Sequence, residues 1–208
     1  MNPDGPIVFV VDDDRRVREA LSRLISSAGL SVITFASAAE FLEFEKPDAP
    51  ACLVLDLQLP GIGGLELQQR LSDEDGPPIV FITGHGDIPS TVRAMKAGAV
   101  EFLSKPFDDG ELLRAIDAAI ALDRTARQKR SEVTELRHRY ALFTAREREV
   151  LPFVIAGFAN KQAAGDLGIA ENTIAVHRGQ IMRKMGARSV AELVRMADKL
   201  GISPANAD

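Results

Sequence analysis

Apolar runs of four or five residues alternate with longer, helix-like segments along the first 122 residues. In the first longer segment, Val17, Leu21 and Ile25 share one helical face, and Gly29 follows as the expected C-cap. Strands and helices that alternate in this way predict an α/β fold: a five-stranded, parallel, doubly wound sheet covered by helices on both faces. The predicted strands are residues 7–11, 32–35, 51–55, 79–82 and 100–103.

A long helical pattern follows these alternating segments. Because neither Gly nor Pro occurs between Glu111 and Phe143, the sequence predicts one continuous connecting helix. Val133, Leu136 and Tyr140 recur in it at helical spacing. They fit either the seam of a coiled coil in a dimer or a solvated helical linker, and the pattern favours neither.

The C-terminal segment predicts a third part made of four short helices. Thr144 with Glu147, and Ser189 with Glu192, match the capping-box pattern that begins a helix. Asn160 is expected to cap the second short helix through its side chain. We therefore expect three parts: residues 1–122, a helical linker over 123–142, and an all-α domain over 143–208.

The composition is that of a soluble globular protein. Hydrophobic residues make up 46% and charged residues 26% of the 208 residues, an ordinary balance for this class. The single cysteine, Cys52, excludes an internal disulfide and fits a reducing compartment. No apolar stretch is long enough to span a bilayer, and the N-terminus lacks a signal-peptide pattern. We expect a cytoplasmic protein with no membrane partner.

Charge is distributed unevenly along the chain. Residues 1–122 contain 20 acidic and 10 basic side chains, whereas residues 123–208 contain 10 acidic and 15 basic ones. An acidic half can hold a cation, and a basic half can bind a polyanion. Ordinary surface solvation explains the same asymmetry, so charge alone does not decide between the two interpretations.

Charged or polar side chains follow four of the five predicted strands. Asp12 and Asp13 follow the first strand, Asp56 the third, Thr83 the fourth and Lys105 the fifth. The carboxyl ends of parallel strands meet at one edge of a sheet, where ligands bind in such folds. Carboxylates can hold a hard cation, an aspartate can act as a nucleophile, and a lysine and a hydroxyl can hold phosphate oxygens. These residue types therefore fit phosphoryl transfer to one of the carboxylates.

The first half resembles the receiver domain of two-component response regulators. The resemblance covers residues 6–122, and its motifs are specific for that family. The matching stretches are residues 10–14, 55–61, 82–87, 94–99 and 102–107.

This resemblance implies a role for each residue of the cluster. Asp56 would accept the phosphoryl group from a sensor histidine kinase. Asp13 and Asp56, with the backbone carbonyl of Gln58, would ligate Mg²⁺ directly, and Asp12 would assist through water. Lys105 would pair with the phosphoryl group.

The resemblance also implies a conformational switch. Thr83 would move toward the phosphoryl group, Phe102 would change position, and the Lys105–Pro106 bond would be cis. The altered surface would form a two-fold homodimer on phosphorylation. Its expected residues are Val92, Met95, Lys96 and Val100.

The last part, residues 143–200, resembles the LuxR/NarL-type helix-turn-helix, and the order of the two halves is that of the FixJ/NarL family. The stretches that match this motif are residues 142–151, 160–164, 173–178 and 181–185. The chain departs from many relatives at Ala175, where a lysine is frequent. The expected contacts with double-stranded DNA are Lys161, Thr173, Val176, His177, Arg178, Gln180 and Lys184.

Together these features predict a two-component response regulator that binds promoter DNA, with Mg²⁺ as cofactor and RNA polymerase as a candidate further partner. We expect no turnover enzyme, only phosphorylation and slow dephosphorylation of Asp56 itself. One alternative is a receiver with a protein-binding or RNA-binding output. Another is a phosphatase like the haloacid dehalogenases, although Arg16 stands where that family needs Thr or Val.

Overall fold

The computed structural model describes residues 5–72, 76–84 and 88–206. The chain divides into two compact units, Met1–Arg127 and Gln128–Asp208. Their boundary falls inside a single helix, α5 (Asp109–Ala141). Each unit has its own hydrophobic core.

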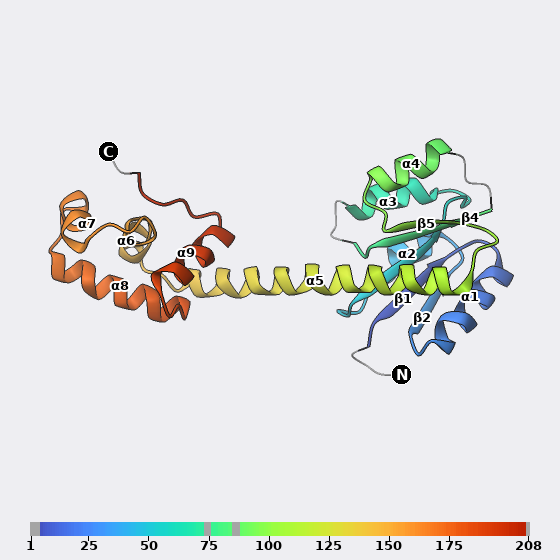
Figure 1. Ribbon diagram of the computed structural model, residues 1–208, viewed down its shortest axis with the longest axis horizontal. Coiled ribbons are helices and arrows are strands. Elements are labelled where there is room, and N and C mark those ends of the chain that lie inside the picture. Colours follow the sequence, from blue (N-terminus) through green and yellow to red (C-terminus); the bar gives the residue numbers. More distant parts are fainter. Residues whose placement is uncertain (1–4, 73–75, 85–87, 207–208) are drawn as a thin grey trace. The chain divides into compact units, whose positions relative to one another are not determined.

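The first unit is built on a five-stranded parallel sheet in the order β2-β1-β3-β4-β5 (Figure 1). The predicted parallel sheet is confirmed, and every predicted strand agrees with the observed one to within one residue at each end. The central strands are buried along their whole length, which explains their unbroken apolar runs. The strands are β1 (Ile7–Val11), β2 (Ser31–Phe35), β3 (Ala51–Asp56), β4 (Ile79–Thr83) and β5 (Glu101–Ser104).

Helices cover both faces of this sheet, as the alternating pattern predicts. On one face, side chains of α1 and the first half of α5 pack against the strands. On the other, side chains of three shorter helices do so. The flanking helices are α1 (Arg15–Ser27), α2 (Ala38–Glu43), α3 (Gly64–Ser72) and α4 (Ile88–Lys96).

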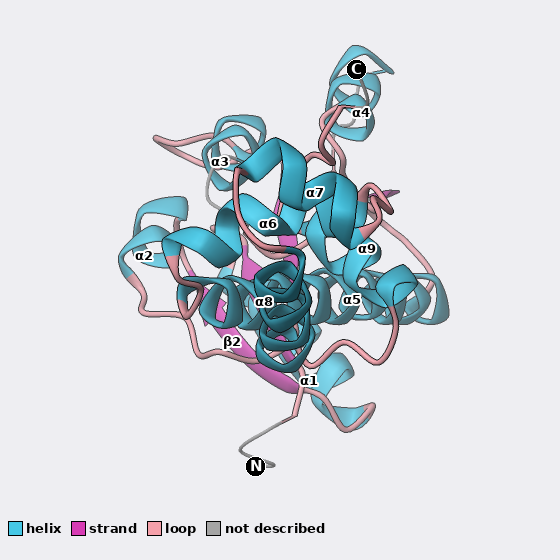
Figure 2. Ribbon diagram, turned by 90° about the vertical axis from the view of Figure 1, so that its left-hand side faces the viewer, coloured by secondary structure: helices cyan, strands magenta, loops and turns pink. Residues whose placement is uncertain are grey.

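The second unit contains only helices and loops within its described residues (Figure 2). Leu136 and Tyr140, from the second half of α5, pack into its core. Two of the three residues proposed for a coiled-coil seam are thus used inside this unit. The remaining helices are α6 (Ala145–Ile155), α7 (Asn160–Leu167), α8 (Glu171–Met185) and α9 (Val190–Lys199).

The predicted caps of these helices have mixed outcomes. At α6, Thr144 Oγ1 accepts from the amide of Glu147, whose carboxylate accepts from the amide of Thr144, so this capping box is confirmed. The prediction for Asn160 is wrong. Ala159 occupies the N-cap, and the side chain of Gln162 accepts a hydrogen bond from its amide.

At α9 half of the expected capping box forms. Ser189 Oγ accepts a hydrogen bond from the amide of Glu192. The carboxylate of Glu192 accepts the amide of Arg188, one residue before the position that the pattern predicts.

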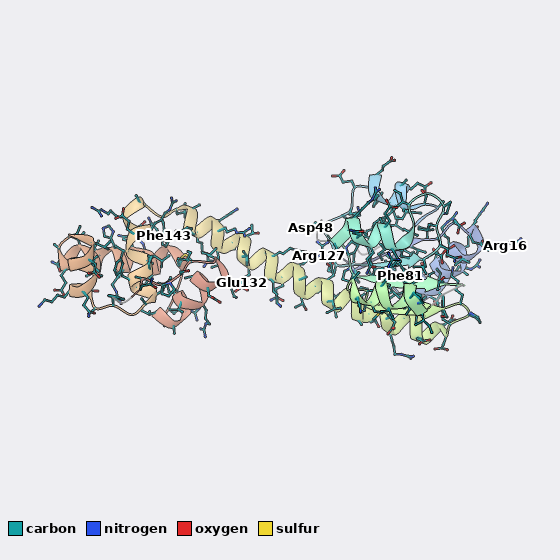
Figure 3. The ribbon with its side chains drawn as sticks, turned by 90° about the horizontal axis from the view of Figure 1, so that it is seen from above. Arg16, Asp48, Phe81, Arg127, Glu132 and Phe143 are labelled. Carbon is teal, nitrogen blue, oxygen red and sulfur yellow. The ribbon has the colours of Figure 1, made fainter. Side chains whose placement is uncertain are left out.

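A buried carboxylate fastens α5 to the start of β3. Asp123 is 2% exposed, and its Oδ2 accepts hydrogen bonds from the amide of Ala51 at 2.8 Å and from Arg127 Nε at 2.7 Å. Arg127 also pairs with Asp48 on the loop before β3, and Figure 3 shows these two side chains together. The helix that enters the second unit is therefore attached to the strand that ends in Asp56.

We predict that Asp123→Ala lowers the stability of the first unit by about 2 kcal/mol, because a buried amide and a guanidinium lose a charged acceptor. Native-state hydrogen exchange at the Ala51 amide measures this loss. Asp117→Ala, at an exposed position of the same helix, is the control and should change stability by less than about 0.5 kcal/mol. Equal protection of Ala51 in both variants would contradict the prediction.

Candidate functional site

The parallel sheet brings the ends of β1 and β3 side by side. Val11 pairs with Leu55, so Asp12 and Asp56, one residue further along, are neighbours. The chain runs outward from β1 in both directions, to β2 on one side and to β3 on the other. Such a switch point leaves a crevice at the carboxyl ends of the strands, where ligands bind in doubly wound sheets.

Lys105 bridges these two aspartates. Its Nζ donates to Asp12 Oδ2 at 2.7 Å and to Asp56 Oδ1 at 3.2 Å. The Asp12 side chain is 1% exposed and that of Asp56 is 9% exposed. The Lys105–Pro106 bond is cis, as the receiver resemblance implies.

Burial is the largest influence on the pKa of Asp56. It raises the pKa of Asp56, the charges of Asp12 and Asp13 add to the rise, and Lys105 opposes it. Burial alone would lower the pKa of Lys105, but the hydrogen bonds and charges of the two aspartates raise it. Lys105 therefore keeps its proton and compensates part of the negative charge.

The negative charge that Lys105 leaves uncompensated suits a divalent cation. Asp13 is exposed beside Asp12, and Gln58 is exposed just after Asp56. Within the described residues, no three Asp, Glu, His or Cys side chains converge on a metal position. Mg²⁺ typically takes only one or two carboxylates and keeps several waters. The donors available here, carboxylates and a backbone carbonyl, fit that chemistry.

Thr83 ends β4, the strand beside β3, and Phe102 lies on β5, where it pairs with Phe81. Thr83 is fully buried, and its carbonyl accepts the amide of Lys105 at 2.7 Å. Phe102 is half-buried and lies against Phe81, with 6.2 Å between the ring centroids. Residues 85–87, which belong to one of the matching stretches, lie outside the described residues.

Gly64 is a site residue that the sequence reasoning missed. A Cβ at this position would lie 2.6 Å from the carbonyl oxygen of Asp56 and 3.0 Å from Cα of Leu57. The amide of Gly64 also donates to the carbonyl of Leu57 at 3.1 Å. The loop that follows Asp56 can thus fold back only with glycine here. The glycine-rich run after Asp56 was the signal that could have identified it.

The α4–β5 face carries exposed apolar side chains. Val92 and Met95 are 43% and 41% exposed, and Lys96 is also exposed. Val100 differs, because it is partly buried and packs against the core.

The second unit presents a helix-turn-helix formed by α7 and α8. Gly168, with a positive φ of 65°, ends α7, and α8 begins three residues later. Thr173 and Lys161 are exposed, and Val176 is 60% exposed. An exposed helix flanked by basic side chains is the element that enters a DNA major groove in this motif.

Other predicted DNA contacts lie within the fold of this unit. Arg178 donates to the carbonyl of Phe158 at 3.0 Å. Lys184 Nζ donates to Glu147 Oε2 at 2.6 Å and to the carbonyl of Leu142 at 2.9 Å. His177 and Gln180 are half-buried.

Family comparisons agree with this geometry. Residues 8–117 match the model of the response regulator receiver domain, and residues 141–197 match that of the bacterial regulatory proteins of the luxR family. The chain belongs to the response regulator family. It joins a receiver to a LuxR-type DNA-binding domain, which implies a histidine kinase and DNA as partners. These families are not the haloacid-dehalogenase phosphatases.

Individual response regulators are similar over almost the whole chain. Nodulation protein W of Bradyrhizobium diazoefficiens is 51% identical over 95% of this chain and 87% of the relative. The transcriptional regulatory protein FixJ of Azorhizobium caulinodans is 45% identical over 98% and 97%. The solved structure of the response regulator StyR is 52% identical, covers 94% of this chain and 99% of its own, and has a TM-score of 0.84. Within the described residues of this response regulator, no helix could span a membrane.

The pair formed by Lys184 and Glu147 predicts a stability effect in the DNA-binding domain. Burial would raise the pKa of Glu147, but its hydrogen bonds to Lys184 and Thr144 lower it overall. We expect Lys184→Ala to cost about 3 kcal/mol of unfolding free energy, because the buried carboxylate loses its cation. Urea denaturation followed through the single tyrosine, Tyr140, reports on this domain, since the chain has no tryptophan.

Lys161→Ala is the matched control, because Lys161 is exposed. Its unfolding free energy should stay within about 0.5 kcal/mol of wild type. If Lys184→Ala unfolds at the same urea concentration as this control, the ion pair does not stabilise the domain.

Proposed function

We propose that Asp56 accepts a phosphoryl group from a partner histidine kinase in a Mg²⁺-dependent reaction, and that this change controls binding to promoter DNA. The observation that carries the proposal is the buried Asp56 carboxylate, held 3.2 Å from Lys105 at the switch point of the sheet. Carboxylate oxygens and the ammonium group of Lys105 lie together there, an arrangement suited to phosphoryl transfer.

The residues suited to hold Mg²⁺ are Asp13, Asp56 and the backbone carbonyl of Gln58, with Asp12 acting through water. When bound, the ion neutralises the phosphoryl oxygens and aligns them. A Mg²⁺ requirement agrees with the three acidic residues and the single bridging Lys105.

Transfer needs little beyond positioning and charge compensation. A carboxylate oxygen of Asp56 forms the new bond to phosphorus, while the bond between phosphorus and the kinase's histidine nitrogen breaks. Lys105 compensates negative charge on the phosphoryl oxygens. Slow hydrolysis of the resulting acyl phosphate resets the protein, so the chain acts as a switch and not as a turnover enzyme.

The new dianion is the signal within the receiver. The hydroxyl of Thr83 moves toward it, Phe102 follows into the space that this opens, and the α4–β5 face rearranges. Two copies then pair through this face. The residues proposed for the homodimer contact are Val92, Met95, Lys96 and Val100.

Dimer formation presents two α8 helices to DNA, one from each copy. The two half-sites in the promoter would be spaced to match the distance between these helices. Val176 and Thr173 are the exposed candidates for base contacts, with His177 and Gln180 beside them, and Lys161 is suited to a phosphate. Arg178 and Lys184 would contact DNA with the donors that their internal hydrogen bonds leave available. Contact of the bound dimer with RNA polymerase is part of the same proposal.

We expect Asp56→Asn to abolish the gain of phosphoryl mass when the full chain is incubated with Mg²⁺ and acetyl phosphate. The amide has no nucleophilic carboxylate, so dimerisation and tighter promoter binding should be lost with it. Intact mass, sedimentation and DNA binding are measured on the same samples.

Asp48→Asn serves as the control, since Asp48 is fully exposed and lies at the opposite end of β3. It should gain the phosphoryl mass as wild type does. The proposal fails if Asp56→Asn still gains that mass and dimerises.

A further inference from the structure

Arg18, on the first helix of the receiver, contacts the backbone of the acidic loop. Its Nη1 donates to the carbonyl of Asp12 at 2.7 Å and to the carbonyl of Asp13 at 3.0 Å. Its side chain is half-buried. One guanidinium nitrogen thus holds two consecutive carbonyls, which belong to the two aspartates that follow β1.

The rest of this loop is held mainly by short-range hydrogen bonds. Asp12 Oδ1 accepts the amide of Asp14 at 2.9 Å, and Asp14 Oδ1 accepts the amide of Arg16 at 2.8 Å. The amide of Asp12 reaches the carbonyl of Phe35 at a longer 3.3 Å. Lys105 Nζ also donates to Asp12 Oδ2 at 2.7 Å and holds that side chain directly. Among these links, Arg18 is the one that fixes two adjacent peptide planes.

We propose that Arg18 is a positioning residue for the phosphorylation reaction. By clamping the carbonyls of Asp12 and Asp13, it fixes the backbone from which both side chains extend before a cation arrives. The inference rests on the proposed role of the acidic cluster as a divalent-cation site. Arg18 itself does not contact the cation or the phosphoryl group.

A clamp and a simple charge effect predict opposite results. Arg18 carries a positive charge beside three carboxylates, so its removal would strengthen cation binding if charge were the only effect. Its removal would weaken binding if the clamp dominates, because the aspartates would have to be ordered during binding. The sign of the change in affinity therefore separates the two effects.

The direct test is Mn²⁺ binding to the full chain, followed by the electron paramagnetic resonance signal of free Mn²⁺. Mn²⁺ suits the same carboxylate and carbonyl donors as Mg²⁺. Arg18→Ala should weaken binding on the order of 10- to 100-fold, the usual loss when an outer partner of a metal ligand is removed. Arg18→Lys should recover part of the affinity, because its ammonium keeps the charge and can donate to a carbonyl.

Arg15→Ala is the matched control, since Arg15 begins the same helix with its side chain 83% exposed and pairs with Glu19. It removes a nearby positive charge but no clamp, and should bind Mn²⁺ as wild type does. A second readout needs no metal: hydrogen exchange at the amide of Asp14 should accelerate in Arg18→Ala and not in Arg15→Ala.

The inference is overturned if Arg18→Ala binds Mn²⁺ as tightly as wild type or more tightly. If Arg18→Ala fails to fold, as judged by its thermal transition, the comparison of Arg18→Lys with wild type and Arg15→Ala decides. In that case, unchanged affinity and unchanged Asp14 exchange in Arg18→Lys overturn the inference. Failure of the proposed function is seen separately, as a wild-type chain that gains no phosphoryl mass at Asp56.

Discussion

The bridge from Lys105 to Asp12 and Asp56 is the interaction on which the receiver site depends. The sheet places two buried carboxylates at the ends of adjacent strands, where they repel each other in a poorly solvated environment. One ammonium, 2.7 and 3.2 Å away, holds them together. A single positive charge does not balance three acidic side chains, and this excess of negative charge is what the proposed divalent cation would compensate.

Much of this site can be predicted from the sequence, because Asp12, Asp56 and Thr83 follow or end buried strands that appear as apolar runs. Lys105 follows β5, which is more exposed. The features that were missed depend on contacts between backbone atoms and side chains. Gly64 is required by a carbonyl close to its α-carbon. Arg18 acts on carbonyl groups, which leave no trace in the amino-acid pattern. Asn160 fits the cap pattern, yet Ala159 is the N-cap, and Gln162 accepts a hydrogen bond from the amide of Ala159.

The DNA-binding domain shows a different limit of sequence reasoning. Its excess of basic residues suggests many phosphate contacts, but Arg178 and Lys184 bond to groups inside the domain. Lys184 joins α8 to Glu147, which is 37 residues away in sequence, and that pairing becomes visible only in the fold. Net charge therefore overstates the number of basic side chains free of internal partners, and the proposed base contacts rest on the exposed Val176 and Thr173.

The most direct test of this account is the pKa of the Asp56 carboxyl, measured by ¹³C nuclear magnetic resonance titration without metal. Asp56→Asn identifies the signal. In wild type the pKa should lie above the usual value for aspartate, because burial outweighs the opposing charge of Lys105. In Lys105→Gln it should rise further, since the carboxylate loses its cation. A pKa that stays the same or falls in Lys105→Gln would contradict the central role of the bridge.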